Sequence, residues 1–390
     1  MKKIALVIFI ALSLMFCVAC LGWSGGVDDA QIGLAAAKRG DHDEAIKYYT
    51  KAINSGDLSR NQLVFVYTSR GGIWWGVKDE YDKSIADYNK AIGLDPRFAP
   101  AYSGRGDAWV GKGEYNKAIA DFTKAIELDP RFVPAYSDRG FAWKAKGEYD
   151  KAIADFNKAI ELFNHDVPHY IYSDRGSVWE AKGEYDKALA DYNKAIELDP
   201  QSATAYSGRG RVWGAQGHLE KALADYNKAI ELNPRSATAY SDRGTAWGIK
   251  GDFDKAMEDF NKAIELDPQS AQAYSGRGKV WGAKGNINKA LYDCDKAIEL
   301  APHDAPAYSS RGIVWMLKGD LEKAITDFTK AIELDPQFAR AYGDRGIAWG
   351  LKGEYDKAIA DFDKALEIKP DYTEARQYRQ EVLEEKRRAQ

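Results

Sequence analysis

The sequence predicts an all-α protein, a solenoid of about ten stacked helix-turn-helix units, and two observations carry this prediction. An Arg-Gly dipeptide recurs through most of the 390 residues, in steps of 35, 34 and 36 residues and then of 34 residues five times. Between the dipeptides, apolar residues return every three or four positions in two successive stretches, which is typical of two amphipathic helices. Units of this length that each form one helix pair stack into a solenoid. The arginines of the dipeptides are Arg70, Arg105, Arg139, Arg175, Arg209, Arg243, Arg277, Arg311 and Arg345.

The unit at 237–270 shows the pattern of the first helix most clearly. Tyr240, Gly244 and Trp247 fall along one stripe of a helix, which identifies the buried side. Gly251 follows a basic last turn and ends the helix, because glycine accepts the left-handed backbone conformation without a steric penalty.

The second helix begins directly after this glycine. Asp252 and Asp254 suit the positive end of its dipole. Pro268 marks its end, since proline cannot continue a helix interior. The apolar face of this helix is formed by Phe253, Ala256, Met257, Phe260, Ala263 and Ile264.

The unit resembles the tetratricopeptide repeat, a helix-turn-helix unit of 34 residues. The matching columns are two large aromatics around a small residue, then alanines around a further aromatic, and a closing proline: Tyr240, Gly244, Trp247, Ala256, Phe260, Ala263 and Pro268. The resemblance covers residues 27 to about 372, as ten repeats. It implies an α-α superhelix whose first helices line a concave groove, and in this family the groove receives extended peptides or partner helices.

One column departs from the commonest pattern of this family, because it holds arginine where leucine is usual. On a helical wheel Arg243 lies beside Trp247, so its side chain points inward and needs an acidic partner. We predict a repeated Arg–Asp bridge to the second helix; the alternative is an arginine ladder for an acidic ligand. The candidate partners are Asp87, Asp121, Asp155, Asp191, Asp225, Asp259, Asp293, Asp327 and Asp361.

The first 22 residues differ from the rest of the chain. Two lysines at 2–3 precede an apolar run at 4–21, which predicts an export signal. The sequence Cys-Val-Ala-Cys at 17–20 resembles a bacterial lipoprotein cleavage site, in which Cys20 becomes acylated and N-terminal. Ordinary cleavage and an uncleaved membrane anchor are the alternatives. Residues 23–26 read as a short flexible tether. We therefore expect an exported protein of the cell envelope, membrane-anchored and facing the periplasm or the exterior.

Two places interrupt the array, and one helix closes it. Repeat one, at about 27–60, lacks two core aromatics and is expected to cap the open end. Repeat two, at 63–98, carries one extra residue, and two more lie in 163–172, where the stacking should shift locally. At 373–390 a helix with one apolar face and many charges is expected to cover the last repeat.

Little in the sequence points to catalysis, a metal or a cofactor. Pro168 argues against a helical His-Asp-x-x-His metal site in 163–172. Cys294 stands in the place of an aromatic core residue with no base nearby, which favours a buried thiol over a catalytic one. Without Lys2 and Lys3 the chain has 53 basic and 59 acidic residues, a net charge of about −6, which disfavours nucleic acid as a ligand. We expect no enzyme, no cofactor and no metal.

The candidate binding surface is the side of the first helix opposite its core stripe. The column of Thr245 varies most between repeats while the core columns barely change, which favours a role in binding a ligand. A row of serines is expected to form a weakly polar groove floor that bonds a ligand backbone. The candidates are Trp75, Ser103, Asp107, Ser137, Phe141, Lys144, Ser173, Ser177, Ser207, Arg211, Ser241, Thr245, Ser275, Lys279, Ser309 and Ile313.

These observations predict a non-catalytic scaffold for protein–protein interaction at the cell envelope, which binds an extended peptide or a partner helix in its concave groove. Two alternatives remain open. One is an assembly platform that acts through its convex face or its ends. The other is an accessory subunit of an envelope enzyme or of a polysaccharide-processing complex. The oligomeric state is not predicted.

Overall fold

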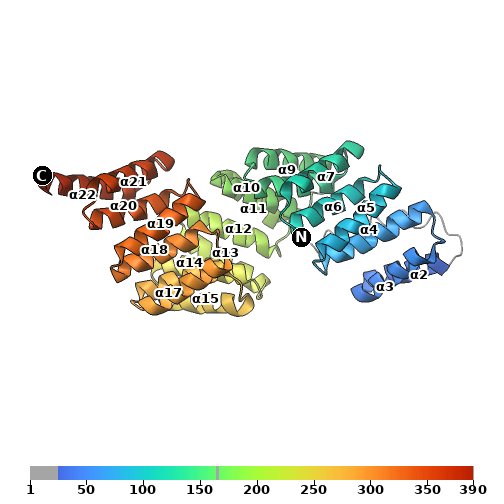
Figure 1. Cartoon of the computed structure of the whole chain (residues 1–390), viewed down its shortest axis with the longest axis horizontal. Coiled ribbons are helices and arrows are strands. Elements are labelled where there is room, and N and C mark those ends of the chain that lie inside the picture. The colour runs from blue at the N-terminus through green and yellow to red at the C-terminus, as the bar shows by residue number, and fades with distance from the viewer. Residues whose placement is uncertain (1–24, 164–166, 390) are drawn as a thin grey trace. The chain divides into compact units, whose positions relative to one another are not determined.

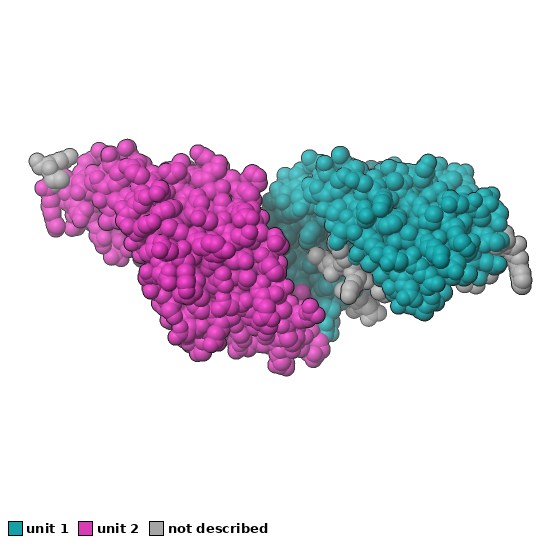
Figure 2. All heavy atoms as spheres, turned by 60° about the horizontal axis from the view of Figure 1, so that its bottom comes forward, with its two compact units in different colours: residues 1–199 teal, residues 200–390 magenta. Residues whose placement is uncertain are grey.

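The computed structural model describes residues 25–163 and 167–389, and every regular element within these ranges is an α-helix. Successive helices form pairs joined by short turns, as Figure 1 shows. Two compact units divide the chain, unit 1 at residues 1–199 and unit 2 at residues 200–390 (Figure 2). The predicted fold class, an all-α solenoid of helix-turn-helix repeats, is confirmed.

Unit 1 contains five helix pairs within its described residues. They are α2 (Gly25–Arg39) with α3 (His42–Ser55), α4 (Arg60–Gly76) with α5 (Tyr81–Leu94), α6 (Ala99–Gly111) with α7 (Tyr115–Leu128), α8 (Val133–Ala145) with α9 (Tyr149–Phe163), and α10 (His169–Ala181) with α11 (Tyr185–Leu198).

Unit 2 contains five further pairs and a closing helix. They are α12 (Ala203–Ala215) with α13 (Leu219–Leu232), α14 (Ala237–Lys250) with α15 (Phe253–Leu266), α16 (Ala271–Ala283) with α17 (Ile287–Leu300), α18 (Ala305–Lys318) with α19 (Leu321–Leu334), α20 (Ala339–Leu351) with α21 (Tyr355–Ile368), and then α22 (Thr373–Ala389).

Caps fix the ends of the helices where the sequence predicts them. The Ser236 hydroxyl accepts a hydrogen bond from the backbone N–H of Ala239, at 3.2 Å, and so starts α14. Gly251 ends α14 in the left-handed region, with φ of 87°. Asp252 starts α15 by accepting from the N–H of Lys255 at 3.2 Å. The turn between α14 and α15 is therefore short, because Gly251 ends the first helix and Asp252 starts the second directly after it.

Small residues let each helix pair lean on the next one. Phe260 is 1 % exposed and packs with the buried alanines of its own pair and of α16. A Cβ atom at Gly244 would lie 3.2 Å from the Phe260 ring, and one at Gly276, on the following first helix, would lie 2.4 Å from it. The ring thus fills the space between two glycine backbones, which explains why aromatic and glycine columns recur together.

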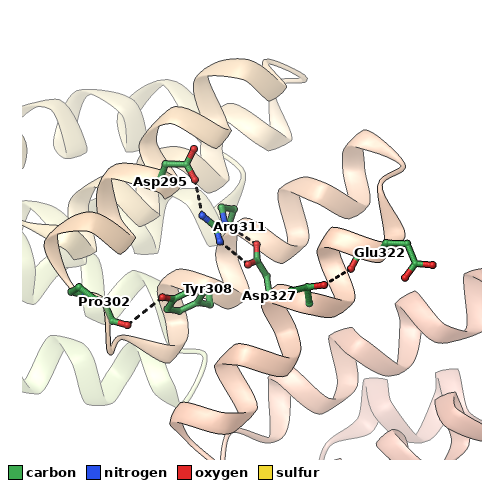
Figure 3. Close-up of polar contacts among 7 residues, drawn as sticks. Asp295, Pro302, Tyr308, Arg311, Glu322 and Asp327 are labelled. Atoms are coloured by element: carbon green, nitrogen blue, oxygen red, sulfur yellow. Dashed lines mark hydrogen bonds and ion pairs between the residues drawn. The ribbon is translucent and has the colours of Figure 1, made fainter.

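Each repeat arginine forms the predicted bridge, and Figure 3 shows the one made by Arg311. Its Nε and Nη2 donate to the two carboxylate oxygens of Asp327, at 2.8 and 2.7 Å, and its Nη1 donates to Asp295 of the preceding repeat, at 2.8 Å. Two parallel charge-assisted hydrogen bonds of this kind fix both distance and orientation. The equivalent pairs have distances of 2.6 to 2.8 Å and are Arg70–Asp87, Arg105–Asp121, Arg139–Asp155, Arg175–Asp191, Arg209–Asp225, Arg243–Asp259, Arg277–Asp293 and Arg345–Asp361.

The Nη1 contact of Arg311 recurs in other repeats and was not foreseen from the sequence. In each case Nη1 of the arginine donates to a polar side chain on the second helix of the preceding repeat. The bridge therefore ties together three helices rather than two. The acceptors are Thr50 for Arg70, Asn89 for Arg105, Thr123 for Arg139, Asn157 for Arg175, Asn227 for Arg243, Asn261 for Arg277 and Thr329 for Arg345.

At the N-terminal end of the array the structure differs from the expectation, and at the C-terminal end it contains the expected closing helix α22. Gly25 and Gly26, assigned to a flexible tether, form the first turn of α2, and Gly26 is buried. At the other end Arg379 continues the arginine column, and its Nε donates to Asp363 at 2.6 Å. The closing helix α22 thus occupies the place of the first helix of a further repeat. The export signal and Cys20 lie outside the described residues.

Candidate functional site

The first helices of neighbouring repeats contact one another, whereas the second helices do not do so to a comparable extent. In unit 1, α4 contacts α6, α6 contacts α8, and α8 contacts α10. In unit 2 each first helix from α12 to α20 contacts the next one, and α20 contacts α22. The first helices therefore lie on the inside of the curve in each unit. We call their exposed side the inner face; its central column holds Asp107, Phe141 and Ser177 in unit 1 and Arg211, Thr245, Lys279, Ile313 and Ile347 in unit 2.

The serine row does not form the accessible floor that the sequence predicted. Six of its seven members are only 0 to 9 % exposed, because they lie where one first helix packs against the next: Ser103, Ser173, Ser207, Ser241, Ser275 and Ser309. Ser275 donates to Ser310 of the next repeat at 2.9 Å. Ser137, which is half-buried, donates to the carbonyl of Pro134 at 3.0 Å. These hydroxyls leave little surface for a ligand and serve mainly helix packing.

Three carboxylates from successive first helices come together on the inner face of unit 1. Asp107 was predicted there from its column, but Asp138 and Asp174, which directly precede the repeat arginines, were missed. Burial and the charge of Asp174 raise the pKa of Asp138 to about 7. Burial and the charge of Asp138 raise the pKa of Asp107 well above its usual range. This part of the inner face is therefore acidic and disfavours further negative charge.

A lysine and two aromatic residues accompany these acids on unit 1. Lys144 donates to the hydroxyl of Ser177 at 2.8 Å, which links α8 to α10. Burial raises the pKa of Asp174 to about 6, and the positive charge of Lys144 opposes this shift. Phe141 and Trp75, both candidates from the sequence, are half-buried. A ligand side chain would find both acidic and aromatic surface here.

In unit 2 Asp242 occupies the position equivalent to Asp138, and a positively charged side chain lies beside it. Asp242 lies close to Arg211, with 3.7 Å from Nη1 to Oδ2, and accepts a hydrogen bond from Nε2 of Gln272 at 2.9 Å. Arg211 occupies the column of Asp107, and Asp242 occupies that of Asp138. The same two places in the repeat therefore hold an ion pair in unit 2 and two like charges in unit 1.

The inner face of unit 2 also exposes aliphatic side chains. Ile249, Leu317 and Leu351 are 57 to 67 % exposed and occupy the same place near the end of three first helices. In unit 1 that place holds Gly111, Ala145 and Ala181. Of the predicted candidates here, Thr245 and Lys279 are exposed and Ile313 is half-buried. Comparing this column between repeats would have found the aliphatic row from the sequence.

The described residues contain no cluster of three or more His, Cys, Asp or Glu side chains arranged to hold a metal ion. Cys294 is fully buried on α17, and burial raises the pKa of its thiol to about 12. Among the helices at 25–163 and 167–389, none is long and apolar enough to cross a membrane.

Family comparisons agree with the repeat pattern. Profiles described as tetratricopeptide repeat match residues 99–132, 133–166, 305–338 and 339–372, and a further one matches 30–55 and 78–98. A profile described as TPR repeat matches 180–217, 215–247 and 249–285. Together these matches span most of the chain. Among curated proteins none matches the sequence.

Solved structures with TM-scores just above 0.5 share the fold. A tetratricopeptide repeat protein from Parabacteroides merdae is 22 % identical, with a TM-score of 0.52, and the match covers 64 % of this chain and 98 % of that one. A chain of the APC/C hetero-tetramer Cut9–Hcn1 is 15 % identical, with a TM-score of 0.51, over 97 % of this chain and 93 % of that one. YrrB, described as a TPR protein with an unusual peptide-binding site, is 30 % identical over 48 % of this chain and 97 % of its own, with a TM-score of 0.32.

Proposed function

Because the chain belongs to the tetratricopeptide repeat family, we propose that it is a non-catalytic scaffold that holds an extended peptide or helix of a partner protein on its inner face. One observation carries the proposal. Core positions repeat almost unchanged, while the central column of the inner face changes residue type from repeat to repeat, through Asp107, Phe141, Arg211, Lys279 and Ile313. A row of different side chains on a regular scaffold is what recognition of one particular partner requires.

The chemistry of the inner face differs between the two units and constrains what each can bind. Unit 1 presents Asp107, Asp138 and Asp174, so basic segments of a partner suit it. Unit 2 presents Ile249, Leu317 and Leu351, so apolar side chains suit it. A partner with separate basic and apolar segments would use both.

We place this function at the cell envelope because of the apolar run at 4–21 and the cysteine at position 20. The partner would then be another exported or membrane protein. A scaffold that is anchored at one end and has no catalytic role can recruit such proteins to one place on the membrane.

Photo-crosslinking from matched positions tests the proposal. A photoreactive residue is placed on the inner face, at position 141 of unit 1 or 245 of unit 2, and its control is placed on the second helix of the same repeat. The controls are Lys158 and Lys262, which form only surface ion pairs, with Glu161 and Glu265, at 2.7 Å. We expect one identified partner to be crosslinked from 141 and 245 but not from the controls. Labelling from the controls alone would show instead that the convex face carries the interaction.

A further inference from the structure

A cavity of about 460 Å³ lies at the C-terminal end of the inner face of unit 2. It is formed by α20, by the turn after α21 and by α22, with Arg340, Asp344, Lys369, Tyr372 and Tyr378 among the residues that line it. Cavities of this size are large enough to enclose a ligand side chain or a small molecule.

Asp344 lies in this cavity as a buried carboxylate whose Oδ2 accepts no hydrogen bond. The residue is 9 % exposed. Its nearest cation is Arg340, with 3.5 Å from Nε to Oδ2, and the Arg340 side chain is 63 % exposed at the rim. Burial raises the pKa of Asp344, and the positive charges of Arg340 and Lys279 oppose this shift. An acceptor buried in this way costs free energy until a donor reaches it.

The repeat itself shows which donors are missing. Asp242 occupies the same place in its repeat as Asp344. Its Oδ1 accepts a hydrogen bond from Gln272 on the following first helix, and its Oδ2 lies 3.7 Å from Nη1 of Arg211 on the preceding one. The residues at those two places around Asp344 are Glu374 and Ile313. Neither an ionised carboxylate nor an aliphatic side chain can donate a hydrogen bond. The amide of Gln272 and the guanidinium of Arg211 therefore have no counterpart at the same places around Asp344, whose nearest cation is Arg340 of its own helix.

The walls of the cavity suit a planar cation. Tyr378 is 41 % exposed, and its ring is stacked on that of Phe362, with centroids 6.5 Å apart and planes 16° apart. Tyr372 forms a further aromatic wall. Three acids line the cavity, Asp344, Asp371 and Glu374, against two basic residues. Aromatic faces together with a carboxylate at the base are the surroundings that a guanidinium group prefers.

We propose that this cavity is a specificity pocket for an arginine side chain of the bound partner, with the guanidinium donating to Oδ2 of Asp344 and lying against Tyr372 and Tyr378. The inference rests on the proposed function, since the arginine belongs to the peptide on the inner face. It names the C-terminal end of unit 2 as the place where a basic residue fixes the position of that peptide.

The pocket can be tested without knowing the partner. The probe is the pentapeptide N-acetyl-Ala-Ala-Arg-Ala-Ala-amide, titrated into the full chain while the methyl resonance of Ile347, which also lines the cavity, is followed by NMR. We expect a saturable shift. The same peptide with citrulline, which keeps the shape but not the charge, should bind at least about tenfold more weakly.

Two variants and one control locate the binding. Asp344→Asn should weaken binding of the arginine peptide by about tenfold or more. Glu374→Gln supplies an amide like the one that Gln272 provides to Asp242. This amide should donate a hydrogen bond to Asp344 within the protein and so also weaken binding of the arginine peptide. The matched control, Asp242→Asn, should leave the affinity unchanged.

Equal binding of the arginine and citrulline peptides, or full affinity in Asp344→Asn, would overturn the proposal. The outcome is separate from that of the crosslinking experiment. If a partner is crosslinked from position 245 but the arginine peptide leaves Ile347 unchanged, only the pocket proposal fails. If the peptide binds at Asp344 but no partner is crosslinked from the inner face, the proposed scaffold function fails while the chemistry of the pocket stands.

Discussion

Arg243 and Asp259 form a two-point bridge between the helices of one repeat, with 2.8 Å from Nε to Oδ2 and 2.6 Å from Nη2 to Oδ1. Asp259 is 5 % exposed, so the carboxylate has exchanged water for the guanidinium almost completely. Asp259 gives the arginine a strong acceptor, and this raises the pKa of Arg243 above its usual value. The pair is a fixed structural contact rather than a mobile surface ion pair.

Replacing Asp259 with alanine should therefore destabilise the protein by more than about 1 kcal/mol, because it leaves the half-buried Arg243 without its charged partner. The measurement is the urea midpoint of unfolding by circular dichroism. As a control, Glu265→Ala removes a surface pair with Lys262 and should change stability by less than about 0.5 kcal/mol. An unchanged midpoint for Asp259→Ala would mean that the bridge contributes nothing.

Gly312→Ala should destabilise by about 1 to 3 kcal/mol, through overpacking. A Cβ atom there would lie 2.7 Å from the ring of Phe328, which is fully buried and has no room to move. Gly248→Ala is the matched change on another first helix, where the nearest atom is 3.8 Å away. It should stabilise by about 0.5 to 1 kcal/mol, since alanine favours the helix. Thermal melting of both variants checks the contrast, and two changes of the same sign would contradict it.

The acidic inner face of unit 1 should make stability depend on pH. The pKa of Asp138 rises from 3.8 to about 7, chiefly through burial and then through the charge of Asp174. The folded state thus holds the proton of Asp138 more tightly than the unfolded state does. The contribution of this carboxyl group to folding stability is therefore fully present below pH about 4 and is lost as the pH rises through about 7.

Asp138→Asn should consequently raise the melting temperature at pH 8 and raise it less at pH 5. Asp242→Asn, which removes the carboxylate that Arg211 and Gln272 contact, should lower it at pH 8. Melting curves at the two pH values provide the test. Equal effects of the two substitutions would show that the charges around Asp138 are compensated.

The thiol of Cys294 should resist modification in the folded protein. Its pKa of about 12 leaves roughly one thiol in ten thousand ionised at pH 8, and the side chain is fully buried. In a Cys17→Ser, Cys20→Ser variant, a chromogenic disulfide reagent should react only after denaturant is added. Rapid reaction of the native protein would mean that α17 opens readily.

Membrane attachment should depend on one cysteine. If Cys20 is acylated, Cys20→Ser should move the protein from the membrane to the soluble fraction on centrifugation, because the lipid provides the attachment. Cys17→Ser serves as the control and should leave the protein on the membrane. Retention of the Cys20 variant would favour the uncleaved anchor.

The repeat pattern predicted the helices and the arginine bridges because both are encoded inside one unit. Glycine after the first helix, proline after the second helix and a spacing of 16 residues from arginine to aspartate, as from Arg243 to Asp259, recur in most repeats. The division between residues 199 and 200 could not be predicted in this way. The segment at 199–206, a turn and the start of α12, has nearly the same sequence as the segment at 267–274, a turn and the start of α16 within unit 2.

The candidate site was predicted less well, because its contacts join different repeats. A helical wheel places Ser241 opposite the core, but it does not show that the next first helix covers this serine completely. Asp138 and Asp174 were missed because their column changes between aspartate, glycine and serine from repeat to repeat and so shows no constant chemistry. The missing donors at Asp344 become visible only when residues of three successive repeats are compared in space.

The Nη1 contacts of the repeat arginines give the array a direction. Eight of these arginines donate from Nη1 to the preceding repeat, as Arg70 does to Thr50 and Arg345 does to Thr329. Fraying of α20 and α21 would therefore leave Arg311 with all its acceptors. Fraying of α3 would deprive Arg70 of one. Within each unit, repeats can detach from the C-terminal side without disturbing the bridges that remain, whereas losing a repeat from the N-terminal side weakens its neighbour.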